Sequence, residues 1–150
     1  MAGVPRPGTI VQRGRAKAYR PLPAARRREI LREGIAAYDR GDFFLAHELL
    51  EPAWMGASDP AERDLYQGLI KLAAALVHEV RGNPAGVLKN LRGARDRLAD
   101  GIAAGARLGI DVPGLIEQID VRMAGADTPT RFGAPVVDRL GRSGRGQARG

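Results

Sequence analysis

Residues 60–81, PAERDLYQGLIKLAAALVHEVR, are the most apolar segment of the 150-residue chain. The leucines recur at the three- and four-residue spacing of one helix face: Leu65, Leu69, Leu72 and Leu76. Alanines at 73–75 and Val77 cover much of the remaining surface of this helix. A helix that is apolar on nearly every side belongs at the centre of a bundle, where small side chains let neighbouring helices approach closely. We therefore expect residues 60–81 to form the central helix of the fold.

The chain on both sides of this segment also has helical apolar spacing. We predict four further helices, over about residues 24–39, 43–54, 84–104 and 112–124. Gly41-Asp42 and Gly82-Asn83 divide the helices into pairs, because glycine commonly ends a helix and Asp or Asn commonly starts one. These turns indicate two helical hairpins of the tetratricopeptide type, and only two hairpins favour a closed bundle over an open array. The predicted fold is all-α, a compact bundle of about five helices.

Composition excludes several classes of protein. Hydrophobic residues make up 44% and charged residues 27% of the chain, which is typical of one globular domain. The chain has no cysteine, which excludes disulfides, thiol nucleophiles and thiolate metal sites and fits a reducing compartment. The longest apolar run, residues 72–77, is far too short to span a membrane, and the N-terminus lacks the apolar stretch of a secretory signal. We expect a cytoplasmic protein without membrane contact.

The formal net charge of +7 is concentrated at the two ends. Residues 1–23 carry five basic and no acidic side chains, and residues 129–150 carry five basic side chains and one acidic one. Residues 24–128 carry a net charge of −2. We predict a flexible basic N-terminal arm (1–23), a helical domain (24–128) and a disordered basic C-terminal tail (129–150). The arginines of these ends could make non-specific nucleic-acid contacts by neutralising phosphates.

The segment 43–54 places polar residues where apolar ones are expected. At about 100° per residue, His47 and Glu51 share a helix face with aromatic side chains. These aromatic side chains form the predicted apolar wall of a pocket: Phe43, Phe44 and Trp54. Charged groups on such a face need partners, because an unpaired buried ion costs several kcal/mol.

Arg63 and Gln67 lie one turn apart on the central helix and could supply those partners. Arg63 could make a bidentate ion pair with Glu51, and Gln67 could satisfy a remaining lone pair. We predict a buried network of His47, Glu51, Arg63 and Gln67 in the groove between segments 43–54 and 60–81. Two outer members are added at its edge: Glu48 and His78.

Several roles are open for this network. It could fix how the two helices dock, or it could line a pocket for a small polar ligand or an acidic peptide end. His47 and Glu51 could also share a divalent metal, with Glu48 or His78 as a third ligand, although we predict no cofactor. The run His47–Glu51 is not the zincin motif, because it ends in glutamate. A self-contained catalytic site is least favoured, because the serines at 58 and 143 lie in expected loops and no glycine-rich phosphate loop is present.

The run FFLAHELLEPAW at 43–54 is followed by Arg63, Gln67-Gly68 and His78. This pattern resembles the domain-of-unknown-function family 309, whose members are small, all-helical and mainly prokaryotic proteins. The resemblance covers roughly residues 26–100 and implies a compact helical bundle. It implies no activity, because none is established for the family. Leu45 stands where an acidic residue is common in the family, and Lys71 stands where glutamine is common.

Together these patterns favour a non-enzymatic binding or interaction protein, with an unknown protein or a small polar ligand as its partner. The first alternative is a metal-binding protein or metal-dependent hydrolase that uses His47, Glu48 and Glu51. The second is a nucleic-acid-associated protein that acts through its arginine-rich ends.

Overall fold

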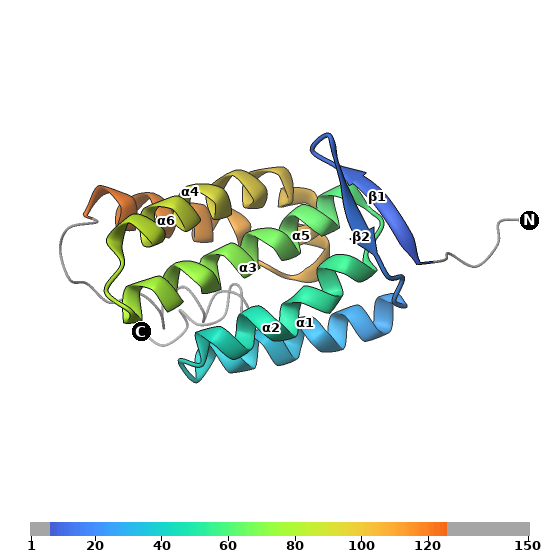
Figure 1. Cartoon of the computed structure of the whole chain (residues 1–150), viewed down its shortest axis with the longest axis horizontal. Coiled ribbons are helices and arrows are strands. Elements are labelled where there is room, and N and C mark those ends of the chain that lie inside the picture. The colour runs from blue at the N-terminus through green and yellow to red at the C-terminus, as the bar shows by residue number, and fades with distance from the viewer. Residues whose placement is uncertain (1–6, 126–150) are drawn as a thin grey trace, which may run out of the picture.

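A computed structural model describes residues 7–125 of the chain. Within this range an antiparallel hairpin precedes six helices (Figure 1). The strands are β1 (Gly8–Gln12) and β2 (Arg15–Tyr19). The helices are α1 (Ala24–Asp39), α2 (Phe43–Gly56), α3 (Pro60–Val80), α4 (Pro84–Asp100), α5 (Ile102–Leu108) and α6 (Val112–Ala124). The predicted mainly helical fold is confirmed, but the helix count and the absence of strands are not.

Helix α3 lies between α2 and α4, with α1 packed beside α2 and α6 beside α4 (Figure 1). The leucines that define its apolar face, from Leu65 to Leu76, are all buried. Leu91, Ala94 and Leu98 of α4 face them and are fully buried. The apolar spacing of residues 60–81 therefore places this helix at the centre of the core, as predicted.

Two glycines let α3 and α4 approach each other closely. A Cβ atom on Gly68 of α3 would lie 2.7 Å from Cγ of Leu98. A Cβ atom on Gly101, which follows α4, would lie 2.7 Å from the backbone nitrogen of Leu65. Contacts this short do not occur between real atoms, so any larger residue at these positions would push α3 and α4 apart.

Side-chain caps start four of the helices where the sequence predicts them. The Asp42 carboxylate accepts a hydrogen bond from the Leu45 N–H at 3.3 Å, and Asp59 accepts one from the Glu62 N–H at 3.0 Å. Asn83 and Asp111 cap α4 and α6 in the same way. These caps satisfy N–H groups that have no partner within the helix, which is why short polar residues precede each start.

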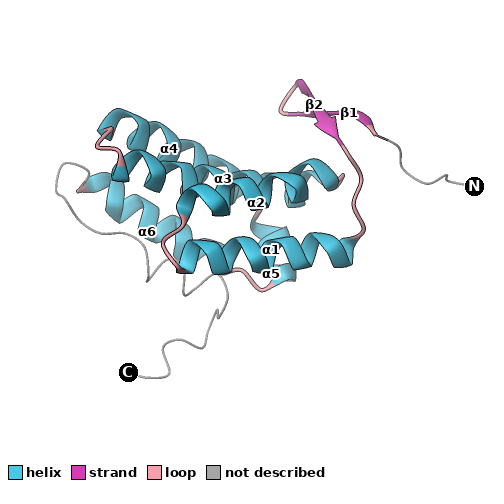
Figure 2. Ribbon diagram, turned by 60° about the horizontal axis from the view of Figure 1, so that its bottom comes forward, coloured by secondary structure: helices cyan, strands magenta, loops and turns pink. Residues whose placement is uncertain are grey.

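The hairpin is the main departure from the predicted fold, because residues 8–19 belong to the arm that was expected to be flexible. The strands pair in register from Gly8 opposite Tyr19 to Gln12 opposite Arg15. Arg13 and Gly14 form the turn with φ angles of 53° and 77°, the combination that matches the twist of paired strands. The hairpin lies at one end of the helices (Figure 2). The all-α prediction was therefore wrong for this segment.

The second departure concerns residues 101–110. The fourth helix was predicted to reach residue 104 and a loop to follow it, but α4 ends at Asp100 and α5 forms over Ile102–Leu108. Residues 1–6 and the whole predicted C-terminal tail (129–150) lie outside the described residues. Within residues 7–125, no helix is both long enough and apolar enough to cross a membrane.

Candidate functional site

A buried polar cluster joins the hairpin to α2 and α3. Its centre is the Gln12 side chain, which is 6% exposed. The Gln12 Oε1 atom accepts hydrogen bonds from Trp54 Nε1 at 2.9 Å and from Arg63 Nε at 3.2 Å. The Gln12 Nε2 atom donates to Asp64 Oδ1 and to Gln67 Oε1, both at 2.9 Å. All the hydrogen-bonding atoms of this one amide side chain are used, so the cluster anchors the hairpin to the helices.

Arg63 is the largest fully buried side chain in this cluster, at 1% exposure. One of its terminal nitrogens donates to the carbonyl oxygens of Trp54 at 3.1 Å and Ala57 at 3.0 Å, and the other donates to Ala18 at 3.5 Å. Its guanidinium lies 5.3 Å from the centre of the Trp54 ring, a cation–π contact. Burial lowers the pKa of Arg63, and the nearby Asp64 opposes this effect. The Gln12 amide oxygen and three backbone carbonyl oxygens therefore accept the hydrogen bonds of Arg63 that the sequence predicted for the Glu51 carboxylate.

The predicted network is divided in the structure. Arg63 and Gln67 meet through Gln12, but the predicted ion pair between Arg63 and Glu51 does not form. Within residues 7–125, the half-buried Glu51 side chain makes no hydrogen bond or ion pair. The Nδ1 atom of His47 is buried without a hydrogen-bond partner and lies 3.6 Å from the Glu48 carboxylate. His47 and Glu51 therefore take no part in the hydrogen bonds of the Gln12 cluster.

The remaining predicted site residues lie apart from one another. Phe44 is 58% exposed and stacks against His47 with ring centroids 6.5 Å apart. Phe43 packs edge-on against Tyr38 at 5.1 Å. His78 lies near the C-terminal end of α3, with its Nδ1 atom 3.1 Å from Asn83 Nδ2. The predicted apolar wall is thus split, with its phenylalanines at the start of α2 and Trp54 near its end.

The described residues do not bring three His, Asp or Glu side chains into a group that could hold a metal ion. The metal site that uses His47 and Glu51, with Glu48 or His78, stays a prediction. The nucleic-acid contacts of the C-terminal arginines also stay a prediction, because residues 129–150 lie outside the described range.

A second buried cluster, centred on Glu62, connects α1, α3 and α5. Arg27 donates to the Glu62 carboxylate from Nε at 2.7 Å and from a terminal nitrogen at 3.3 Å. The Tyr66 hydroxyl donates to the same carboxylate at 2.6 Å, and an Arg107 nitrogen lies 3.6 Å from it. Burial alone would raise the pKa of Glu62, but the hydrogen bonds from Arg27 and Tyr66 hold it below its ordinary value. This carboxylate is therefore ionised and fixed at neutral pH.

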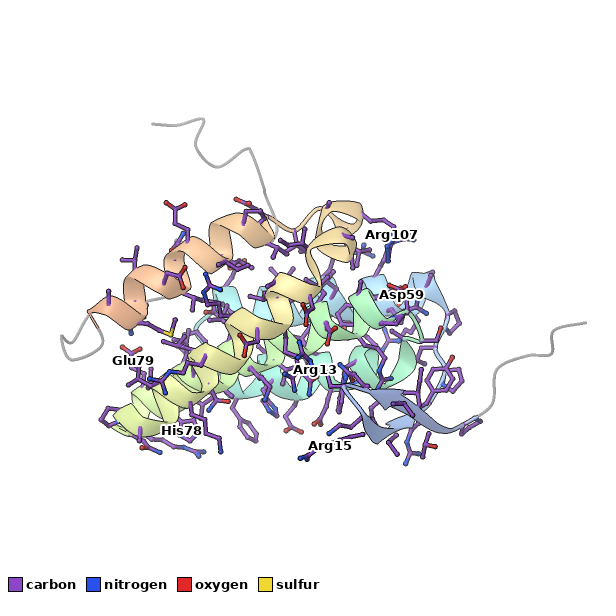
Figure 3. The ribbon with its side chains drawn as sticks, turned by 90° about the horizontal axis from the view of Figure 1, so that it is seen from above. Arg13, Arg15, Asp59, His78, Glu79 and Arg107 are labelled. Atoms are coloured by element: carbon purple, nitrogen blue, oxygen red, sulfur yellow. The ribbon has the colours of Figure 1, made fainter. Side chains whose placement is uncertain are left out.

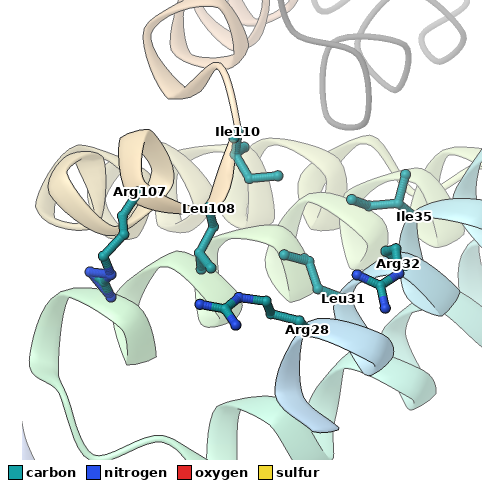
Figure 4. A pocket seen from close by; sticks show the side chains of 8 residues that line it. Arg28, Leu31, Arg32, Ile35, Arg107, Leu108 and Ile110 are labelled. Carbon is teal, nitrogen blue, oxygen red and sulfur yellow. The ribbon is translucent and has the colours of Figure 1, made fainter. Parts of the chain in front are cut away.

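An arginine-lined cleft opens beside the Glu62 cluster, between α1 and the segment from α5 to α6 (Figure 4). Its volume is about 320 Å³, which is at the small end of sites for small molecules. The arginines are Arg28 and Arg32 from α1 and Arg107 from α5. The apolar lining consists of Leu31, Ile35, Leu108 and Ile110. We refer to these residues together with Gly109 as the arginine cleft.

The arginine cleft carries an excess of positive charge. Arg107 lies 3.6 Å from the Glu62 carboxylate and 3.9 Å from that of Asp59, so its charge is partly compensated. Within the described part of the chain, Arg28 and Arg32 form no ion pair or side-chain hydrogen bond. The nearest glutamates on α1, Glu29 and Glu33, pair instead with Arg26. Two guanidinium groups are therefore available to an anion.

The lining of the arginine cleft suits binding better than catalysis. Its side chains are arginines and aliphatic residues, none of which acts as a general base or a nucleophile at neutral pH. Sequence reasoning missed the cleft, although Arg28 and Arg32 lie one turn apart beside Leu31 and Ile35 on α1. The sequence could not predict the position of Arg107, because residues 105–110 were expected to form a loop, whereas Arg107 lies near the end of α5.

Comparison with known proteins supports the family and gives no activity. The chain is similar to a protein of Aquifex aeolicus (strain VF5) described as uncharacterized, with 40% identity over 65 residues. The similar region covers 43% of this chain and 20% of that protein, so the chain spans about one fifth of the length of this relative. No solved structure matches the chain. Residues 31–90 match the family described as a domain of unknown function (DUF309), which confirms the resemblance predicted from the signature residues of α2 and α3.

Proposed function

We propose that the protein is a non-enzymatic binding protein whose ligand is a small anion with an apolar portion, held in the arginine cleft. The observation that carries this proposal is the position of Arg28 and Arg32, which have no ion-pair partner among the described residues, at the edge of an apolar floor. This assignment keeps the small polar ligand expected from the sequence but moves its site from the α2–α3 groove to the opposite side of α1.

The chemistry of the lining defines the class of ligand. A guanidinium presents two parallel N–H donors, which match the oxygens of a carboxylate or a phosphate. The aliphatic floor favours a ligand whose remaining atoms are hydrocarbon, and each buried methylene contributes about 0.8 kcal/mol. A medium-chain carboxylate or alkyl phosphate has both features. Both head groups share one chemistry, and direct comparison of the two distinguishes them.

Titration calorimetry with octanoate and octyl phosphate tests the proposal. Octanoate is expected to bind more tightly than butyrate, because the longer chain reaches the floor formed by Leu31 and Leu108. Octylammonium, which has the same chain and the opposite charge, is expected not to bind. Equal affinity for octanoate and octylammonium would show that the cleft binds apolar chains without selecting an anion, which would contradict the proposal.

A pair of variants locates the site. The double change Arg28→Gln and Arg32→Gln is expected to weaken octanoate or octyl phosphate binding about tenfold or more, because it removes charge-assisted hydrogen bonds. The matched control is Arg26→Gln, which removes a charge from the same helix but from the residue that pairs with Glu29 and Glu33. An equal loss in the control would place the anion elsewhere.

A further inference from the structure

The three lysines of the chain gather on one face of the molecule, formed by the hairpin, α3 and α4. They are Lys17 on β2, Lys71 on α3 and Lys89 on α4. The arginine cleft is lined by α1 and the segment from α5 to α6, so it shares no element with the lysine face. Arg15, on the same strand as Lys17, and Arg107 of the cleft lie on opposite sides of the molecule in Figure 3.

The position of Lys71 depends on Gly93 of α4, which has no side chain to block it. A Cβ atom on Gly93 would lie 2.8 Å from Cδ of Lys71 and 3.6 Å from its Nζ atom, so the Lys71 side chain lies across Gly93. Gly93 is one turn after Lys89 and one turn before Arg97, which places all three on one face of α4. The Lys71 side chain therefore crosses α4 at Gly93, midway along the helix between Lys89 and Arg97.

Lys17 points toward the same place from the hairpin. Residues that pair across antiparallel strands share a face, and so do residues two apart along one strand. Lys17 pairs with Ile10, which shares its face with Gln12. Because Gln12 is buried against α3, Lys17 lies on the face of the hairpin that looks toward the helices, and it is half-buried there.

The three lysines have no acidic partner among the described residues, whereas Arg97 lies within electrostatic reach of Asp64, Asp96 and Asp100. In residues 7–125, Lys17, Lys71 and Lys89 form no ion pair or hydrogen bond, and Arg97 donates from Nε to the neutral Gln67 at 2.9 Å. The nearby carboxylates of Asp64 and Asp100 are both occupied by Arg13. Burial lowers the pKa of Lys71, and repulsion from Arg97, Lys89, Lys17 and Arg13 lowers it further. A bound anion would relieve this repulsion.

We propose that Lys17, Lys71, Lys89 and Arg97 form a binding surface for the phosphate backbone of a nucleic acid. The row from Lys89 to Arg97 alone spans about 12 Å along α4, and one strand of a duplex carries a phosphate about every 3.4 Å of axis. A single small anion would use only part of such a row, whereas a phosphodiester strand can contact all of it. Contacts between these cations and phosphates carry no sequence information, so we expect binding that is independent of base sequence.

A nucleic acid fits this face better than a membrane surface does. Membrane association of this kind combines basic residues with apolar side chains that insert between lipids. The exposed apolar residue of the hairpin, Val11, alternates with Gln12 along β1 and so points away from the lysine face. The cations come from β2, α3 and α4, and Arg97 is hydrogen-bonded to the amide of Gln67.

The test uses fluorescence anisotropy of the full chain with a labelled 20-base-pair duplex and a 20-nucleotide poly(dT) strand. The double variant Lys71→Gln and Lys89→Gln removes two charges from the row. The matched control, Arg40→Gln and Arg81→Gln, removes two charges from exposed positions at the helix turns. This pair separates a defined surface from the general effect of net charge, including that of the basic ends.

Duplex binding by the row variant is expected to weaken at least about tenfold at low salt. The slope of log K against log salt concentration is expected to fall by about two, because each lost phosphate contact contributes about 0.9. The control is expected to change the slope by less than half of that. Restoration by Lys71→Arg and Lys89→Arg, with no variant melting below the wild type, shows that charge rather than loss of folding is responsible.

Three results would overturn the proposal. The first is absence of wild-type binding to both oligonucleotides. The second is an equal loss of affinity in the row variant and the control, which would show that net charge alone acts. The third is a row variant that keeps its oligonucleotide affinity but loses binding to vesicles of anionic phospholipid, which would assign the lysine face to a membrane.

Discussion

The Nε atom of Arg63 donates a hydrogen bond to Oε1 of Gln12 at 3.2 Å, across 51 residues of sequence. This contact brings the hairpin into the same buried cluster as the two helices that carry the family signature. Gln12 therefore replaces Glu51 as the residue that satisfies Arg63. The hairpin acts as a structural part of the helical domain.

Replacing Gln12 with alanine is expected to destabilise the protein by about 1–3 kcal/mol, because it leaves buried donors on Trp54 and Arg63 without their partner. The hairpin should also become accessible to trypsin at Arg15 and Lys17. Urea unfolding, followed through the single tryptophan, and limited proteolysis measure the two effects. The exposed Thr9 on the same strand provides a control, and Thr9→Ala should leave cleavage unchanged. Equal cleavage in both variants would show that Gln12 does not anchor the hairpin.

Replacing Glu62 with glutamine is expected to cost about 3–5 kcal/mol at pH 7, the usual effect of removing one member of a buried ion pair. The folded-state pKa of Glu62 lies below its unfolded value, so its contribution is fully present above about pH 4.3. That contribution is lost as the pH falls through the folded-state pKa. The difference in unfolding free energy between wild type and Glu62→Gln should therefore shrink on acidification.

The control for this prediction is Glu29→Gln, which removes an exposed carboxylate whose ion pair with Arg26 is 3.0 Å long. Exposed pairs contribute about 0–1 kcal/mol, so this variant should remain close to wild type. A Glu62→Gln protein with wild-type stability at pH 7 would contradict the role of the buried cluster.

Replacing Gly101 with alanine is expected to lower the unfolding free energy by about 1–3 kcal/mol, because the new Cβ atom would clash with the backbone of Leu65. The φ angle at Gly101 is −98°, which alanine adopts readily, so the clash and not the backbone conformation causes the loss. The Gly8→Ala variant has open space around its Cβ atom and should be close to neutral. Thermal unfolding of the two variants gives the comparison, and a stabilised Gly101→Ala protein would show that α3 and α4 are less tightly packed.

Replacing Lys71 with methionine is expected to stabilise the protein by about 0.5 kcal/mol at neutral pH and low salt, because it removes a charge that is disfavoured by burial and by the like charges around it. The sign follows from the lowered pKa of Lys71, which shows that its charged form is disfavoured in the folded protein. Added salt should reduce the gain by screening the repulsion. Urea titrations at two ionic strengths measure it. A destabilised variant would mean that Lys71 contributes to folding, and the lysine face would then lose its functional interpretation.

The helical core could be predicted from sequence because its signals are local. The leucine spacing of residues 60–81 and the capping residues Asp42 and Asn83 act within one or two turns, so they can be recognised without knowing the fold. The hairpin has only a short local signal, the β-branched run Thr9–Val11 and the turn glycine Gly14. Its outward residues are exposed, and Gln12, which holds it in place, depends on helices far along the chain.

The candidate site shows the same limit. The helical wheel correctly predicted that Arg63 is buried and that Gln67 lies near it. The wheel could not show which segments supply the partners of Arg63, because its guanidinium contacts both strands of the hairpin as well as α2. The arginine cleft depends on Arg107, whose position follows from the packing of α5 and from the break at Gly101. Sites assembled from distant segments carry no periodic signal.

The close packing of α3 against α4 has a practical consequence for recombinant work on this protein. The matched region, residues 31–90, stops before Leu91, Ala94 and Leu98 and starts after Gln12. A fragment trimmed to these limits would expose the leucines of α3 and leave the buried Arg63 without the Gln12 amide. We therefore expect the fragment to aggregate when expressed. Soluble expression should require a polypeptide that starts before Gly8 and extends at least to Ala124.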